Sequence, residues 1–149
     1  GNYAEAEPFY REILERERKH ERIQYGAESH STARCLEGLA WILHARGRHD
    51  EAESALREAV AILKTRWDGF DRNALSDYQG IQVRLVELLS VEGKHDEAEA
   101  ILRTILEQDK KLAAESNRNW AVEHRSAPLG PMDSYVVRSL NLLARELWR

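Results

Sequence analysis

The chain has 149 residues, a length that suits one compact domain or a short repeat array. Its formal net charge of −4, from 22 Lys and Arg against 26 Asp and Glu, is too small to favour nucleic acid or an anionic membrane surface as a partner. The single cysteine, Cys35, excludes an intrachain disulfide and favours a reducing compartment, so we expect a cytoplasmic protein. No apolar run has the length of about 20 residues that a membrane-spanning helix needs.

One phrase of the sequence occurs three times. It reads "GNYAEAEPFYREILERER" from Gly1, "GRHDEAESALREAVAILK" from Gly47 and "GKHDEAEAILRTILEQDK" from Gly93, so the copies lie 46 residues apart. A period in this range is typical of helical arrays, in which each short unit buries its apolar face by stacking on its neighbours. The sequence therefore predicts an all-α solenoid of helix pairs.

Each phrase starts a helix, which we call B-type. Its apolar residues recur at intervals of three and four, the spacing of one helical face. In chain order they are Ala6, Phe9, Tyr10, Ile13 and Leu14; Ala52, Ala55, Leu56, Ala59, Val60 and Leu63; and Ala98, Ile101, Leu102, Ile105 and Leu106. The small alanine that opens each stripe is expected to let two helices approach closely beside a turn.

A second apolar pattern lies between the phrases and predicts a partner helix, which we call A-type. Its recurring positions are Leu36, Leu39, Ala40 and Leu43; Gln82, Leu85, Val86 and Leu89; and Leu140, Leu143, Ala144 and Leu147. Gly47 and Gly93 fall where an A-type helix must end and the chain must turn back, a place that favours a left-handed glycine. The acidic "DEAE" that follows complements the positive end of the B-type helix.

These patterns predict about six helices in antiparallel pairs. The expected segments are a B-type helix in 1–24, A/B pairs in 29–67 and 74–114, an extended helix or an insertion in 115–131, and a final A-type helix in 132–149. The chain thus starts and ends on unpaired helices without polar caps. We therefore expect a fragment of a larger protein, with self-association through the terminal helices.

The glycine at the turn, "EA" just inside the B-type helix and the L-x-x-L-A/V core of the A-type helix resemble the tetratricopeptide repeat. "YGAESHSTARCLEGLA" (25–40) and "LGPMDSYVVRSLNLLA" (129–144) are similar to the linker of its kinesin-light-chain type. This resemblance implies a right-handed superhelix whose A-type helices line a concave groove for an extended peptide or a partner helix. On the three A-type helices the implied groove residues are Arg34, Glu37, Trp41 and His44; Gly80, Val83, Glu87 and Ser90; and Arg138, Asn141, Arg145 and Trp148.

The implied groove departs from the family pattern. Of the family's asparagine pair, which resembles a clamp for a ligand backbone, only Asn141 is present, and a mixed surface around Trp41 replaces it. Two interpretations of Trp41 are open: it anchors a partner, or it packs between neighbouring A-type helices.

No motif in the sequence predicts chemistry. The chain has no G-x-S-x-G, no Gly-rich phosphate loop, no C-x-x-C and no H-E-x-x-H, so we predict no catalytic residue, metal ligand or cofactor. His49 and His95 recur one period apart, which the turn between helices explains. The charges of "ERERKHER" (15–22) alternate in sign, which is typical of a solvated helix face rather than of a nucleic-acid site.

Two functions fit these observations. The first is a non-catalytic scaffold that binds a peptide or a partner protein in the groove. The alternative is a regulatory or oligomerisation segment of a larger signalling NTPase, similar to those of the NACHT or NB-ARC kind. A phosphate-binding domain upstream in the full protein would favour the alternative.

Overall fold

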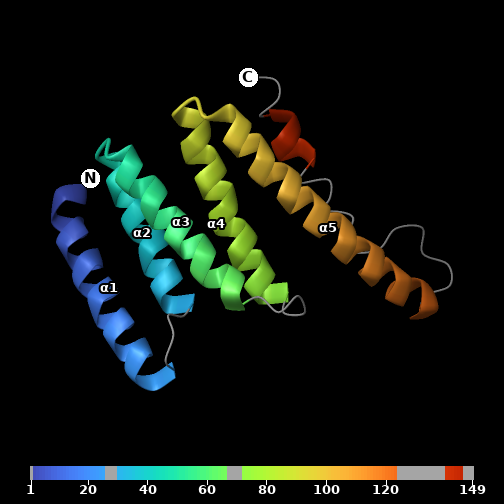
Figure 1. The fold of residues 1–149 in the computed structure, drawn as a ribbon, viewed down its shortest axis with the longest axis horizontal. Coiled ribbons are helices and arrows are strands. Elements are labelled where there is room, and N and C mark those ends of the chain that lie inside the picture. Colours follow the sequence, from blue (N-terminus) through green and yellow to red (C-terminus); the bar gives the residue numbers. More distant parts are fainter. Residues whose placement is uncertain (1, 26–29, 67–71, 124–139, 146–149) are drawn as a thin grey trace. The chain divides into compact units, whose positions relative to one another are not determined.

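The computed structural model describes residues 2–25, 30–66, 72–123 and 140–145, and every element among them is helical. The helices are α1 (Tyr3–Tyr25), α2 (His30–Ala45), α3 (His49–Arg66), α4 (Arg72–Val91) and α5 (His95–Glu123), and 140–145 are also helical (Figure 1). The protein is therefore all-α, with α2 and α4 as A-type helices and α1, α3 and α5 as B-type helices. The chain divides into two compact units, residues 1–92 and 93–149.

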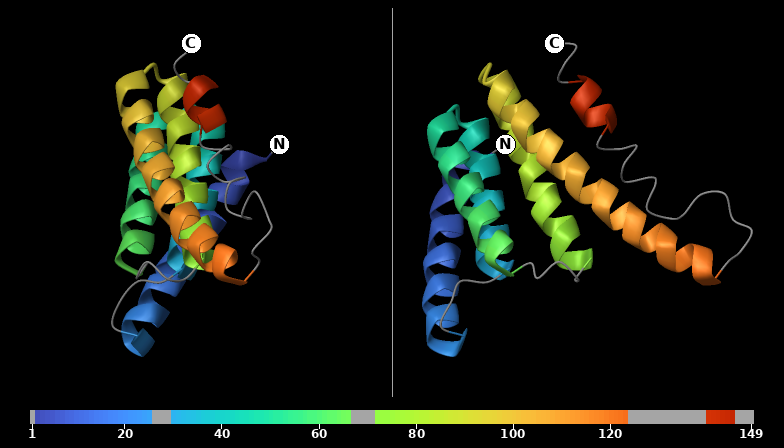
Figure 2. Two further views of the ribbon diagram at one scale, coloured as in Figure 1. Left: turned by 90° about the vertical axis from the view of Figure 1, so that its right-hand side faces the viewer. Right: turned by 45° about the vertical axis from the view of Figure 1, so that its right-hand side comes forward.

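The first unit contains four helices that pack against one another in chain order. α1 packs on α2, α2 on α3 and α3 on α4, and Figures 1 and 2 show the four helices side by side. Buried side chains fill the space between them because the predicted apolar stripes face one another. Among them are Leu36, Leu39 and Leu43 of α2, Ala52, Leu56 and Leu63 of α3, and Ile81, Leu85 and Leu89 of α4.

The turn between α2 and α3 is closed by backbone hydrogen bonds around a left-handed glycine. Gly47 has a φ of +74°. Its N–H donates to the carbonyl of His44 and the N–H of Arg48 donates to the carbonyl of Leu43, each at 2.9 Å. This pair of bonds is the Schellman arrangement, which satisfies carbonyls that a helix end leaves without partners. Gly93 also has a φ of +74°, so the expected left-handed conformation is present at both repeated glycines.

In the second unit, α5 continues well beyond its predicted stripe. Its buried residues include Ala98, Leu102, Ile105 and Ala113. Helix continues to Glu123, so the first part of the segment 115–131 extends the B-type helix. Residues 124–131 lie outside the described residues.

Equivalent apolar positions are not buried equally in the three copies. Phe9 of α1 is 65% exposed, whereas Ala55, one period later on α3, is 7% exposed. Tyr10 is also exposed, whereas its equivalents Leu56 and Leu102 are buried. The difference arises because α3 packs against two described helices, α2 and α4, whereas α1 packs mainly against α2.

A candidate interaction groove in the first unit

A groove with a volume of about 530 Å³ lies entirely in the first unit. All four helices of the unit contribute to it, but α2 and α4, the two A-type helices, supply most of its wall. Its lining residues are Tyr10; Arg34, Glu37, Gly38, Ala40, Trp41, Ile42 and His44; Leu56; and Arg84, Glu87, Leu88 and Val91. Such a cavity is large enough for several side chains of a partner.

The wall at α1 depends on a glycine in the middle of α2. A β-carbon added to Gly38 would lie 2.2 Å from Cε1 of Tyr10, far inside van der Waals contact. Glycine weakens a helix interior because its backbone loses more entropy on folding. Here the missing side chain lets the Tyr10 ring lie directly against α2, so Gly38 explains how a B-type side chain reaches the groove.

One end of the groove is apolar and open to solvent. Trp41 of α2 is 58% exposed and Val91 of α4 is 66% exposed, whereas Leu56 and Leu88 below them are buried. An exposed tryptophan beside other apolar side chains is typical of binding surfaces. Trp41 is thus exposed in the groove, and its role as an anchor for a partner stays a prediction.

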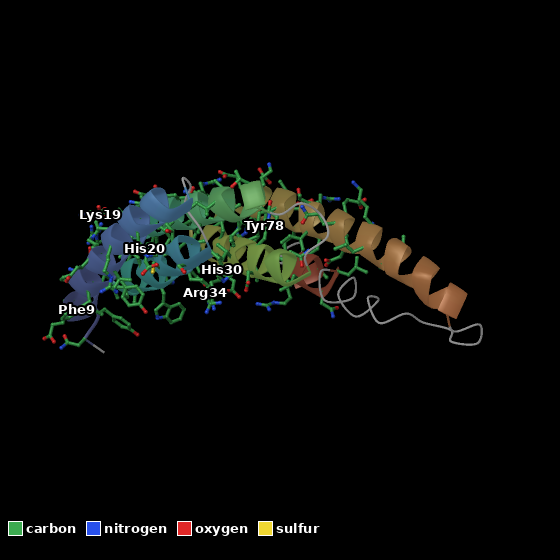
Figure 3. All side chains as sticks on the ribbon, turned by 90° about the horizontal axis from the view of Figure 1, so that it is seen from below. Phe9, Lys19, His20, His30, Arg34 and Tyr78 are labelled. Carbon is green, nitrogen blue, oxygen red and sulfur yellow. The ribbon has the colours of Figure 1, made fainter. Side chains whose placement is uncertain are left out.

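Opposite charges join α2 and α4 across the groove. Glu37 of α2 pairs with Arg84 of α4. Nη1 of Arg34 lies 3.9 Å from Oδ1 of Asp77, and Nε2 of His30 lies 3.5 Å from Oδ2 of the same carboxylate. Figure 3 shows Arg34 on the side of α2 that faces away from α3. Both arginines of the groove wall therefore face a carboxylate of the protein itself.

Glu87 differs from the other charged residues of the groove. Its side chain is exposed, and within the described part of the chain it makes no hydrogen bond or ion pair. Glu87 occupies the position in α4 that Trp41 occupies in α2, one period of 46 residues later. The two side chains line the same cavity. An exposed indole and a carboxylate without an ion-pair partner among the described residues therefore lie in the same groove.

His44 closes the groove near the turn and contacts a second imidazole. Its Nδ1 lies 3.0 Å from Nδ1 of His49, and the ring centroids are 4.9 Å apart. One ring donates and the other accepts, depending on their tautomers. Among the described residues, no cluster of three or more His, Cys, Asp or Glu residues could hold a metal ion.

A buried carboxylate outside the groove holds α1 to the α2–α3 turn. Glu7 is 6% exposed. Its Oε1 accepts a hydrogen bond from Nε of Arg11 at 2.8 Å and one from Nη1 of Arg48 at 2.8 Å, and Oε2 pairs with Arg46. Burial alone would raise the pKa of Glu7, but the hydrogen bonds from Arg11 and Arg48 outweigh it and hold the pKa below its ordinary value of 4.5.

The ion pair between Glu7 and Arg11 could have been predicted from the repeat. Glu7–Arg11 is an i, i+4 ion pair, and one period later each time the chain has Glu53–Arg57 and Glu99–Arg103, which also pair. Sequence reasoning did not single these pairs out. The arginines of the turn, Arg46 and Arg48, make the first pair a link between helices, and Arg11 adds a contact to Glu51 of α3 at 3.5 Å.

The structure brings together five of the predicted groove residues, which are Arg34, Glu37, Trp41, His44 and Glu87. Val83 is half-buried and does not line the groove. Ser90 differs from the expectation, because it is 7% exposed and its hydroxyl donates to the carbonyl of Val86 at 2.7 Å. The next residue, Val91, takes the place at the groove edge.

The predicted residues of the third A-type helix lie in the second unit or outside the described residues. Asn141 and Arg145 are exposed on the helical segment 140–145. Arg138 and Trp148 lie outside the described residues. Sequence reasoning missed eight lining residues, namely Tyr10, Gly38, Ala40, Ile42, Leu56, Arg84, Leu88 and Val91. A signal existed for one of them, because Glu37 and Arg84 have opposite charges at nearly equivalent positions of successive A-type helices.

The arrangement of paired A-type and B-type helices with a groove beside the A-type helices defines a helical repeat protein. Two family models match the chain, at residues 1–65 and 43–116, and both describe the tetratricopeptide repeat. The chain belongs to this family. Repeats of this family generally mediate protein–protein interactions as non-catalytic scaffolds. The resemblance to the kinesin-light-chain type stays a prediction.

No curated protein matches the chain. None of the described helices combines the length and the apolar character needed to cross a bilayer.

Proposed function

We propose that the groove of the first unit binds a peptide or a segment of a partner protein, and that the protein acts through this binding rather than through catalysis. The observation that carries the proposal is the exposure of Trp41 in a groove of about 530 Å³. Tryptophan is enriched among the residues that dominate binding energy, because it buries a large rigid surface at low cost in conformational entropy.

The surroundings of Trp41 support a protein ligand. Tyr10 and Val91 add exposed apolar surface, while Arg84 and Glu37 supply charged groups beside it. An apolar centre with a polar rim is the usual composition of a protein interface. The mild net charge of −4 gives the chain no general attraction for polyanions, which favours protein over nucleic acid as the partner.

Selection from a randomised dodecamer peptide library, followed by fluorescence anisotropy on purified protein, tests this function. Trp41→Ala is expected to weaken the selected peptides at least about tenfold, which corresponds to about 1.4 kcal/mol. Its melting temperature is expected to change little, because the indole is mostly exposed. Phe9→Ala is the matched control, since Phe9 is an equally exposed aromatic residue that does not line the groove.

Two results would contradict the proposal. One is that no peptide is selected above the background of unloaded resin. The other is that Trp41→Ala binds the selected peptides as tightly as the wild type, or loses binding only in proportion to lost folding.

Self-association through α1 is a separate proposal about partners. Its basis is Phe9, which is exposed although the equivalent Ala55 is covered. Sedimentation over a hundredfold range of concentration tests it, with Phe9→Ser as the variant. A strict monomer at the highest concentration would exclude this association.

A further inference from the structure

We infer that the groove selects a segment in which a bulky apolar side chain lies beside a lysine or arginine, with Glu87 pairing with the cation and Trp41 stacking on it. This inference rests on the proposed function, because it assigns the chemistry of the ligand that the groove takes. It follows from the charges of the groove, the position of the indole and the shape of the apolar end.

Among the described charged side chains that line the groove, one carboxylate has no ion-pair partner. Arg84 is paired with Glu37, and Arg34 faces Asp77. Glu87 has no such partner among the described residues. A ligand with a positive charge therefore meets an open carboxylate, and it displaces no existing ion pair when it binds.

The exposed indole strengthens the preference for a cation. Trp41 and Glu87 are equivalent positions on successive A-type helices and line one cavity. A cation over the face of tryptophan is attracted by the negative face of the ring, and more strongly when it is desolvated. An exposed ion pair alone contributes little, so the indole and the carboxylate together discriminate better than either group alone.

The apolar end of the groove accounts for the second half of the motif. Val91 and Tyr10 are exposed there, over buried Leu56 and Leu88. A leucine or phenylalanine of the ligand would cover these side chains and remove their apolar surface from water, which favours binding. Because Glu87 and Val91 are one helical turn apart on α4, the basic residue and the apolar residue of the ligand should be close neighbours in its sequence.

A ligand with an acidic residue beside the apolar one is the competing possibility. Its carboxylate would have to draw Arg84 from Glu37 or Arg34 from Asp77. It would also lie near the negative charge of Glu87, and juxtaposed like charges oppose binding. The arrangement of charges therefore favours the basic ligand.

Three defined libraries test the inference directly. Each contains nonamer peptides with one central leucine or phenylalanine in a Gly/Ser background, flanked at each of the four nearest positions by lysine, by glutamate or by serine. Fluorescence anisotropy on the full chain is expected to give about five- to tenfold tighter binding for the best lysine peptides than for the matched glutamate peptides.

Substitutions at Glu87 and Trp41 distinguish the ion pair with the carboxylate from the stacking on the indole. Glu87→Lys should reverse the preference, so that glutamate peptides bind more tightly, whereas Trp41→Leu should reduce the preference for lysine while the apolar contact persists. Glu12→Lys is the matched control, because Glu12 is an exposed glutamate of α1 outside the groove and its replacement changes the net charge equally. It should leave the preference unchanged.

Each result has a distinct meaning. Equal binding of the three libraries, or a preference for glutamate, overturns this inference and leaves the groove as a peptide site. If Glu12→Lys shifts the preference as much as Glu87→Lys, general charge and not Glu87 governs selection, and the inference fails. If none of the libraries binds and the randomised selection also yields nothing, the proposed function fails as well.

Discussion

The ring of Tyr10 lies where a β-carbon of Gly38 would be, with Cε1 2.2 Å from that position. One residue on α1 and one on α2 thus depend on each other, because only a glycine allows the ring to lie so close. This contact brings α1 into the wall of a groove that the A-type helices otherwise form. A substitution at either residue should therefore change the effect of a substitution at the other.

The first prediction is a coupling between these two residues. Gly38→Ala alone should destabilise the protein by about 1–3 kcal/mol, because the added methyl group displaces the Tyr10 ring. In a Tyr10→Ala background the same change should stabilise it by about 0.5–1 kcal/mol, since alanine favours a helix interior. Urea denaturation of the four proteins of this double-mutant cycle measures the coupling. Additive effects would show that the ring moves away without cost.

Gly47 and Gly80 should respond oppositely to the same substitution. Gly47→Ala is expected to cost about 1–2 kcal/mol, because its φ of +74° brings a β-carbon too close to the backbone. Gly80 lies within α4, and a β-carbon there would meet nothing within 4 Å. Gly80→Ala should therefore stabilise the protein by about 0.5–1 kcal/mol. Thermal denaturation followed by circular dichroism compares them, and a shift of the same sign for both would contradict this reading.

The loss of folding stability at acidic pH should depend on Glu7. Because the folded-state pKa of Glu7 is lowered, its carboxylate contributes stability above the ordinary value of 4.5, and this contribution is lost as the pH falls through the folded-state pKa. Glu7→Gln should cost about 1–3 kcal/mol at pH 7, where the arginines lose their charged acceptor. The difference from the wild type should shrink as the pH falls below 4.5 and through the folded-state pKa of Glu7.

Urea denaturation at a series of pH values from 7 to 3 measures this dependence. Glu12→Gln is the control, since Glu12 is exposed on the same helix. Its stability should follow the wild type at every pH. A constant difference between Glu7→Gln and the wild type over the whole range would show that ionisation of Glu7 is not what stabilises the contact.

The opening alanines of the B-type stripes should tolerate a larger side chain to different extents. Ala52 is fully buried, whereas the equivalent Ala6 on α1 is only half-buried. Ala52→Leu is expected to cost about 1–3 kcal/mol through overpacking, and Ala6→Leu should cost less. Midpoints of urea denaturation rank the two variants. A larger loss at Ala6 would mean that α1 packs more tightly against its neighbours than its exposure indicates.

The repeated glycine turns and the two apolar patterns were sufficient to predict an all-α array of helix pairs, because they are local signals. The groove was harder to predict, because it depends on which side chains their neighbours leave uncovered. Tyr10 has the same place in its repeat as the buried Leu56, but α1 packs mainly against α2, whereas α3 packs against both α2 and α4.

Ser90 shows that an equivalent position in the repeat does not always predict a groove residue. It matches His44 in the repeat, but a small hydroxyl can return its hydrogen bond to its own helix and be buried, as it does with Val86. A histidine ring at the same position extends further and reaches the groove. Side-chain size, which a positional alignment ignores, thus decided which residue lines the wall.

The link between Glu7 and the arginines of the turn has a consequence for the groove. Glu7 and Tyr10 lie one helical turn apart on α1, so the carboxylate that fixes α1 also fixes the tyrosine wall. Glu7 is buried and its arginines bond to it at 2.8 Å, and dissolved ions screen such pairs much less than exposed charges more than about 8 Å apart at physiological ionic strength. The tyrosine wall should therefore stay in place when salt is added, and the affinity of the groove for an uncharged ligand is expected to vary little with ionic strength.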